Sequence, residues 1–182
     1  MRKLLSAYFS RLLKSKLFRI EMLIAMAMSG LLLFVNQFEG ASSIKYMDYP
    51  YFSQFIYNPV VFAAFITLFI GTEYSDGAIR NKLSTGHSRL AVYGSNLCVS
   101  IIMSALFVLV QIAVCLSIGL LVFEPFRLPM EQIMAAAMTA CLTAASSAAI
   151  YTAMAMNIQN KASSVITAVA LNFAVMLLVS MI

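Results

Sequence analysis

The sequence predicts an all-α, polytopic membrane protein with an N-terminal amphipathic helix at the membrane surface and five transmembrane helices. Five long apolar runs, separated by short charged segments, fill nearly all of the 182 residues. Hydrophobic residues make up 62% of the chain and charged residues only 10%, whereas about a quarter of the residues in an average soluble domain are charged. The runs are apolar on every side, unlike the helices of a soluble core. We therefore divide the chain into a surface helix at 1–18 and a transmembrane domain at 19–182.

The first segment, residues 1–18, has the pattern of an amphipathic helix. Its apolar side chains recur at helical spacing, at Leu4, Leu5, Tyr8, Phe9, Leu12 and Leu13. Basic and small polar side chains fill the other positions, so we expect this helix to lie along the inner membrane surface. A secretory signal peptide is the alternative, but the basic residues spread over nearly the whole segment and the next apolar run is long enough to span a membrane.

The five apolar runs lie at 20–38, 55–72, 97–123, 133–156 and 162–182. An α-helix rises about 1.5 Å per residue, so about 18 to 20 residues cross a hydrocarbon core of about 30 Å. Each run is long enough to do so. The chain ends inside the last run, at Ile182, without the polar flank that usually anchors a span. We expect that it is shortened from a form with a sixth span.

Lysine and arginine residues gather on one side of the predicted membrane. Ten of the twelve lie before the first run, between the second and third runs, or between the fourth and fifth. The other connections carry only Lys45 and Arg127. Because the basic side faces the cytoplasm, we expect a cell-membrane protein with a cytoplasmic N-terminus. This asymmetry also explains the net charge of +5 without a nucleic-acid partner.

The outer connection at 39–54 is rich in aromatic side chains. It contains Tyr46, Tyr49, Tyr51 and Phe52. Tyrosine rings favour the boundary between hydrocarbon and water, so we expect these residues to be interfacial anchors. A role in gripping a substrate is the alternative.

The predicted spans are almost free of charge, which argues against an ion pump. Only Glu21, at the inner edge of the first run, comes near membrane depth, and we expect it to pair with a neighbouring basic residue. Neutral polar side chains within the runs should form hydrogen bonds between helices rather than contact a substrate. They are Ser29, Gln111, Thr139, Ser146, Ser147, Thr167 and Asn172. Alanines four residues apart, from Ala136 to Ala148, should let a neighbouring helix approach closely.

The inner connection between the second and third runs has strong helix signals. Ser75 or Asp76 is expected to cap a short helix at about 76–85, and Gly86 to end it. Ser88 is expected to cap the next helix, which continues to Phe123 over about 35 residues, or about 53 Å. That helix is longer than the bilayer needs, so it must tilt or project into the cytoplasm. An ordinary solvated connection remains the alternative for the short helix.

The same stretch resembles the segment after the second span of the ABC-2 type permeases, the membrane subunits of ATP-binding-cassette exporters. The resemblance rests on Glu73 with Tyr74, on Gly77 to Leu83, and on Gly86 to Arg89. It implies that this segment is a coupling helix seated in a groove of an ATPase subunit, that the surface helix also touches the ATPase, and that two permeases of six spans each form a dimer. This chain departs from that pattern by ending before a sixth span. The implied coupling residues are Glu73, Tyr74, Asp76, Gly77, Ile79, Arg80, Asn81, Lys82, Leu83, Gly86 and Arg89.

The sequence lacks recognisable nucleotide-binding, catalytic and metal-binding motifs. It has no Gly-x-x-x-x-Gly-Lys-Ser/Thr phosphate loop, so we expect ATP and Mg²⁺ to bind a partner subunit and this chain to hold no cofactor and to be no enzyme. The single histidine, His87, has no second ligand or catalytic partner in sequence, and a surface position is expected. Cys98, Cys115 and Cys141 have spacings that fit neither a metal site nor a disulfide framework, so they are expected to be small buried hydrophobic residues.

The leading functional hypothesis is an exporter permease. A partner ATPase would move the coupling segment at 73–89, and an amphiphilic substrate such as a drug, an antimicrobial peptide or a lipid would pass outward. A channel or ion-coupled carrier is one alternative, which the neutral spans disfavour. A membrane anchor or assembly subunit that does not transport is the other, which the missing sixth span permits.

Overall fold

The computed structural model describes residues 2–39, 46–86, 88–158 and 160–181, without the side chains of residues 2–7, 39 and 179. The described part is helical, and its one β-type contact is an isolated bridge between Tyr46 and Glu124. The helices are α1 (Arg2–Lys14), α2 (Lys16–Glu39), α3 (Asp48–Ser53), α4 (Asn58–Ser75), α5 (Ala78–Ser84), α6 (Arg89–Val122), α7 (Met130–Ile158) and α8 (Lys161–Ser180). His87 and Lys45 lie outside the described residues.

Five segments are long and apolar enough to cross a membrane. They are Lys16–Phe38, Asp48–Ser75, Arg89–Val122, Met130–Ile158 and Lys161–Leu178, the second of which comprises α3 and α4. Each contains or largely overlaps one of the predicted runs. The predicted fold class, an all-α polytopic membrane protein, is confirmed.

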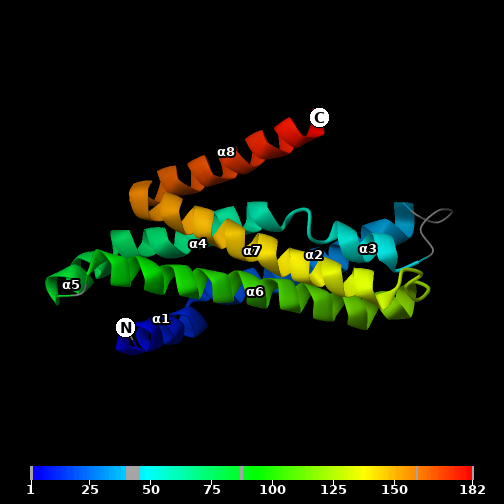
Figure 1. The fold of residues 1–182 in the computed structure, drawn as a ribbon, viewed down its shortest axis with the longest axis horizontal. Helices are drawn as coiled ribbons and strands as arrows, with labels where there is room; N and C mark the ends of the chain where they lie inside the picture. Colours follow the sequence, from blue (N-terminus) through cyan, green and yellow to red (C-terminus); the bar gives the residue numbers. More distant parts are fainter. Residues whose placement is uncertain (1, 40–45, 87, 159, 182) are drawn as a thin grey trace.

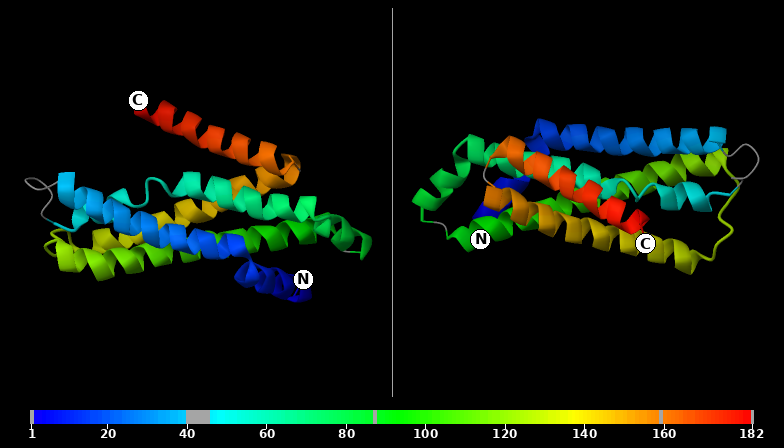
Figure 2. Two further views of the ribbon diagram at one scale, coloured as in Figure 1. Left: turned by 180° about the vertical axis from the view of Figure 1, so that it is seen from behind. Right: turned by 90° about the horizontal axis from the view of Figure 1, so that it is seen from above.

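Four of the long helices run side by side, and α8 departs from them. In Figure 1, α2, α4, α6 and α7 follow the long axis of the molecule, while α8 leaves at an angle and carries the C-terminus away from the bundle. The view from behind in Figure 2 shows the same departure, and in the view from above α8 crosses in front of the bundle. Inside the bundle, α4 packs against α7 and α8, and α6 packs against α2 and α7. We call the two ends of the bundle the α5 end, which also holds α1, and the α3 end.

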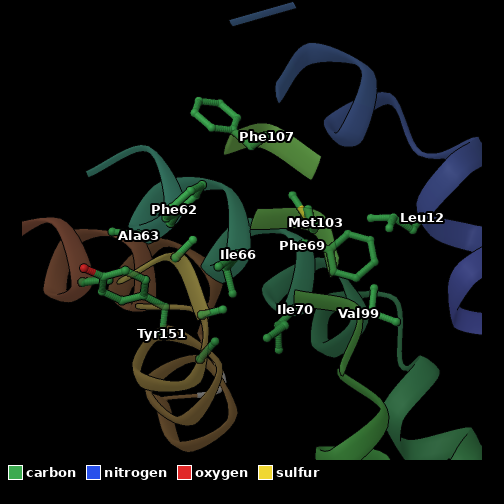
Figure 3. Close-up of a cluster of buried hydrophobic side chains, with 14 of the residues drawn as sticks. Leu12, Phe62, Ala63, Ile66, Phe69, Ile70, Val99, Met103, Phe107 and Tyr151 are labelled. Atoms are coloured by element: carbon green, nitrogen blue, oxygen red, sulfur yellow. The ribbon is translucent and has the colours of Figure 1, made fainter. Parts of the chain in front are cut away.

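The core is built around the inward faces of α4 and α6. Phe62 of α4 and Phe107 of α6 meet edge to face, with 5.3 Å between ring centroids. Figure 3 shows further buried side chains around this pair, including Met103 of α6 and Tyr151 of α7. Such aromatic pairs stabilise a core beyond the burial of their area.

The alanine stripe of α7 packs as the sequence predicts. Ala140, Ala144 and Ala148 are all buried. The approach of α6 is close enough for the Ser104 hydroxyl to donate a hydrogen bond to the backbone oxygen of Ala144, at 3.3 Å. Small side chains permit this close contact between membrane helices.

The connection that leads into α3 closes the α3 end of the bundle. The backbone N–H of Met47 donates to the Glu124 carbonyl oxygen at 3.0 Å, and Met47 itself is fully buried. Tyr49 is exposed, as expected for an interfacial anchor, but Tyr51 is only 2% exposed. Tyr51 packs edge to face against Phe126 at 5.5 Å between centroids. The anchor prediction is therefore wrong for Tyr51, because its ring belongs to the protein interior.

Five of the polar side chains within the spans fall into two groups. Ser29 and Asn172 bond across helices, the first to Gln54 and to the Gln111 backbone, the second to Tyr151 and to the Pro59 backbone. Three others instead donate to their own helix three or four residues back, namely Thr139, Ser146 and Thr167. For these three, the expectation of interhelical bonds is wrong, because a hydroxyl in a helix can satisfy itself locally.

Glu21 departs from its predicted role. Its side chain is 0% exposed, and within the described part of the chain neither carboxyl oxygen has a hydrogen-bond partner. The neighbouring basic residue Arg19 lies on the exposed side of α2. The expected ion pair is therefore not formed.

Candidate functional site

The segment at 73–89 folds into the end of one helix, a short helix and the start of the next. α4 continues to Ser75, with Asp76 as its C-cap, and α5 begins only at Ala78. The residue between them, Gly77, has φ of 67°, a left-handed conformation that glycine adopts without steric cost. The prediction that Ser75 or Asp76 caps α5 is wrong, since the Ser75 hydroxyl bonds back to the Thr72 carbonyl at 3.0 Å.

The following helix begins as predicted. The Ser88 hydroxyl accepts a hydrogen bond from the Ala91 N–H at 3.2 Å, which caps the N-terminus of α6. Gly86, expected to end the short helix, has φ of 88° and donates its N–H to the Leu83 carbonyl at 3.1 Å. α6 then runs for 34 residues to Val122.

Glu73 is the centre of the site. Its side chain is 0% exposed. Oε2 accepts hydrogen bonds from the Tyr8 hydroxyl at 3.1 Å and from Asn96 Nδ2 at 3.3 Å. Oε1 accepts from Lys82 Nζ at 2.9 Å and forms an ion pair with the Arg11 guanidinium. We refer to Tyr8, Arg11, Glu73, Lys82 and Asn96 as the Glu73 cluster.

The Glu73 cluster joins four helices at the α5 end of the bundle. Tyr8 and Arg11 come from α1, Glu73 from α4, Lys82 from α5 and Asn96 from α6. Lys82 Nζ also lies 3.5 Å from the centroid of the Tyr8 ring, a cation–π contact. A buried carboxylate is tolerated only when its charge and its lone pairs are satisfied, and here two cations and two neutral donors do so. Displacing any one of the four helices would disturb the bonds of the other three.

Burial sets the protonation of two members of the cluster. Desolvation, then the neighbouring Glu73 carboxylate, raises the pKa of Tyr8 above its ordinary value, so its hydroxyl stays a neutral donor. Desolvation lowers the pKa of Lys82, although its hydrogen bond to Glu73 acts in the opposite direction. Both effects follow from taking polar groups out of water.

The structure divides the residues that the sequence assigned to the site. Glu73 and Ile79 are buried, and Tyr74, Gly77, Lys82 and Leu83 are half-buried. Only part of the set lies open on the surface of the α5 end, namely Asp76, Arg80, Asn81, Gly86 and Arg89. Thus the segment has an inner side that holds it to the bundle and an outer side that is free for contact with another molecule.

Two adjoining hollows flank α5. One, of about 370 Å³, is lined by residues that include Arg89, Tyr93 and Asn157. The other, of about 440 Å³, is lined by residues that include Gly77 and Arg80. Tyr74 borders both, and its hydroxyl donates to the Met156 carbonyl at 2.9 Å, which ties α4 to the end of α7. The surface around α5 is therefore indented and carries arginine side chains.

Sequence reasoning missed three members of the cluster. Tyr8 was counted on the membrane-facing side of the first helix, but it is buried against the bundle, as is Leu12, whereas Leu13 is 50% exposed. Arg11 was counted only as a basic residue, and Asn96 was not considered. The sequence did hold a signal for Asn96, because it is an amide directly before the third apolar run. A buried acid on an adjacent helix, such as Glu73, needs a hydrogen-bond donor of this kind.

Comparison with known proteins gave one match. A family model described as ABC-2 family transporter protein matches residues 4–179. The searches of curated proteins and of solved structures found nothing similar to the chain. The matched range includes the whole Glu73 cluster and the segment at 73–89.

Proposed function

The chain belongs to the ABC-2 family of transporter proteins, as the residues at 73–89 predicted, and on this premise we propose that it is the permease subunit of an exporter driven by a separate ATPase. Members of this family are membrane transport components, and the five apolar helices agree with a multi-pass membrane protein. In our proposal the α5 end is cytoplasmic, in line with the basic residues concentrated there. ATP and Mg²⁺ bind the partner, and a second permease, either another copy of this chain or a paralogue, completes the transporter.

The Glu73 cluster is the observation that carries this proposal. An ATPase that pushes on α5 needs a mechanical link to the spans, because the chemical energy is released outside this chain. Lys82 on α5 bonds directly to Glu73 on α4, and Glu73 bonds to Asn96 on α6 and to Arg11 on α1. Movement of the short helix would therefore be passed to two spans and to the first helix at once.

The exposed side of α5 is the surface we assign to the ATPase. It offers Arg80 and Asn81 on the helix, with Arg89 at the start of α6, all exposed. The hollows beside the helix, bordered by Tyr74, add an indented surface to these polar groups. A short, well-anchored helix that presents polar side chains outward is suited to seat in a groove of a partner.

We propose that the cargo is amphiphilic and moves outward. The spans offer no paired intramembrane charges that would hold a small ion, since Glu21 is the one described acid buried at depth in a span away from the Glu73 cluster. The long helices instead expose large apolar side chains such as Leu109, Met138 and Leu142, which suit a drug, an antimicrobial peptide or a lipid. Assay of the ATPase rate in the presence of candidate compounds would identify the class.

The docking experiment uses charge reversal on α5. The chain is co-purified with candidate ATPases as wild type, as Arg80→Glu and as Arg127→Glu. Arg127→Glu is the matched control, because Arg127 is also an exposed arginine but lies at the α3 end. We expect Arg80→Glu to lose ATPase binding at least tenfold, and Arg127→Glu to bind like the wild type.

A second variant separates docking from coupling. Glu73→Gln keeps the outer side of α5 but breaks the cluster, so we expect it to bind the ATPase and to lose the stimulation of hydrolysis by cargo. Unchanged binding and unchanged turnover in both Arg80→Glu and Glu73→Gln would overturn the proposal. Ion flux in proteoliposomes that contain this chain alone would instead support a channel or an ion-coupled carrier.

A further inference from the structure

The buried stripe of α2 is unusually polar for a helix with an apolar exterior. Its buried residues recur about every four positions, at Glu21, Ala25, Ser29, Leu33 and Asn36. Large apolar side chains cover the outward side of the helix. The stripe faces α6, against which α2 packs (Figure 2). Three of its five side chains are therefore polar groups inside the protein.

The helix α6 also carries buried polar side chains, at Asn96, Ser100, Ser104 and Gln111. Two of them bond to other helices, since Asn96 donates to Glu73 of α4 and Ser104 donates to the Ala144 carbonyl oxygen of α7. The Ser29 hydroxyl lies 3.3 Å from the Gln111 carbonyl oxygen, which fixes the register of the two helices. Both helices run from the α5 end toward the α3 end, so Glu21 lies about 12 Å closer to the α5 end than Ser29. On α6 that level falls near Met103, within one turn of Ser100.

Six of the ten unpaired buried polar side-chain atoms of the described chain belong to α2 and α6. They include both carboxyl oxygens of Glu21, the Ser100 hydroxyl and both amide atoms of Gln111. Buried polar groups are nearly always hydrogen-bonded, so each exception needs an explanation. Glu21 is the most costly of these exceptions, because burying an ionised carboxylate without a partner in a span costs several kcal/mol of free energy.

No cation of the described chain neutralises Glu21. The helices that pack against α2 are α1, α3, α4 and α6. On α1 and α4, the buried or half-buried charges Arg11 and Glu73 are bonded within the Glu73 cluster, and Lys14 is exposed. On α3, Asp48 accepts backbone hydrogen bonds at the opposite end, and on α6 Arg89 is exposed.

A metal ion does not fit the position either. The described residues contain no group of three histidine, cysteine or acidic side chains that could hold one. A proton needs neither such ligands nor a cavity. We propose that Glu21 is a proton-binding site on the α2–α6 seam, at which the carboxylate takes one proton from water and is neutral in this conformation.

The position of Glu21 would link this proton to movement. α2 begins two residues after Lys14, the last residue of α1, and α1 is held by Tyr8 and Arg11 in the Glu73 cluster. A movement of α1 that opens the seam to water would let Glu21 ionise and release its proton. This last step rests on the proposed coupling function, whereas the proton site itself does not.

Difference infrared spectroscopy tests the site on the purified chain, without an ATPase. The spectrum of the wild type at pH 7 is compared with those of Glu21→Gln and Glu73→Gln. We expect Glu21→Gln to lose a C=O band of a protonated carboxyl group, and Glu73→Gln to lose carboxylate bands instead. Loss of only carboxylate bands in Glu21→Gln would overturn the proposal. Failure of the ATPase experiments would leave this result unaffected, so the two proposals can fail separately.

Thermal unfolding gives a second test, because the pH dependence of stability reports protons that are bound by the folded state. A proton held by the folded state and released on unfolding makes stability fall as pH rises. The unfolding temperature of the wild type should therefore fall between pH 5 and pH 8 relative to that of Glu21→Gln, which has no such proton. Parallel curves for the two proteins would contradict the proton site.

Discussion

At the scale of single residues, Glu73 connects parts of the chain that lie far apart in the sequence. The sequence singles it out because it stands with Tyr74 in the stretch that resembles the ABC-2 type permeases. Its bonding partners lie 62 and 65 residues away in α1, and 23 away in α6. Such pairs depend on how the helices pack, which local patterns do not specify. The sequence thus identified Glu73 but assigned it to a surface that contacts an ATPase. In the structure the Glu73 side chain is instead buried.

Because Glu73 forms buried ion pairs, we expect its substitution to lower the stability of the protein more than substitution of the neighbouring acid Asp76. Glu73→Gln removes the carboxylate from two cations, and we expect a loss of about 2 to 3 kcal/mol, since Arg11 and Lys82 can still partly reach water. Asp76→Asn is the matched variant. Asp76 is 66% exposed and 3.8 Å from Arg11, so its loss should stay below about 1 kcal/mol. Unfolding in detergent by a chemical denaturant measures both values, and equal losses would contradict the assigned role of Glu73.

Tyr8 predicts a specific pH dependence. The pKa of Tyr8 is raised by burial and by Glu73, whereas an unfolded tyrosine titrates near pH of about 10. The stabilisation from Tyr8 is therefore complete below about pH 10 and is lost as pH rises above it. Tyr8→Phe should be less stable than the wild type by about 1 kcal/mol at pH 7. The difference should shrink above about pH 10 in thermal unfolding, and a difference that stays constant to pH 12 would argue against the bonded hydroxyl.

At the scale of elements, helix existence was predictable and helix boundaries were less so. Long apolar runs predicted α2, α4, α6, α7 and α8, because length and hydrophobicity are continuous along each. The break at Ser15 was not predicted, since both flanking segments favour helix. There the Ser15 N–H donates to the Leu12 carbonyl at 3.0 Å and the Ser15 hydroxyl accepts from the Phe18 N–H at 3.1 Å. A serine that ends one helix and caps the next leaves little trace in hydrophobic periodicity.

The α3 end predicts opposite outcomes for two helical glycines. A Cβ added at Gly119 of α6 would overlap the fully buried Met47, whereas one at Gly30 of α2 would meet nothing within 4 Å. Gly119→Ala should therefore destabilise the protein by only about 1 kcal/mol, because the atoms in its way are the flexible end of the Met47 side chain, and Gly30→Ala should cost nothing or stabilise its helix slightly. Thermal unfolding distinguishes them. Adding Met47→Ala to Gly119→Ala should lower the penalty of the glycine substitution, and an unchanged penalty would show that Met47 is not the obstacle.

At the scale of the whole molecule, the fold class could be predicted because the surroundings of the chain are the hydrocarbon of a membrane. A chain in hydrocarbon must satisfy its backbone polar groups internally, so apolar runs of sufficient length become helices. Which helices pack against each other could not be predicted from the sequence, because membrane helices associate through small residues and scattered polar contacts. Ser104 against Ala144, and Asn172 against Tyr151, are such contacts. They became visible only once the packing of α4, α6, α7 and α8 was known.

The topology of the molecule is the last prediction, and it governs the proposed function. Asn81 on α5 and Tyr49 on α3 lie on exposed sites at opposite ends of the bundle, so in a membrane they should face opposite compartments. The basic α5 end should face the cytoplasm. With the native cysteines replaced by serine, a membrane-impermeant thiol reagent should label Tyr49→Cys on intact cells and should label Asn81→Cys only after permeabilisation. Labelling of Asn81→Cys on intact cells would place α5 outside, where no cytoplasmic ATPase could reach it, and would remove the basis of the coupling mechanism.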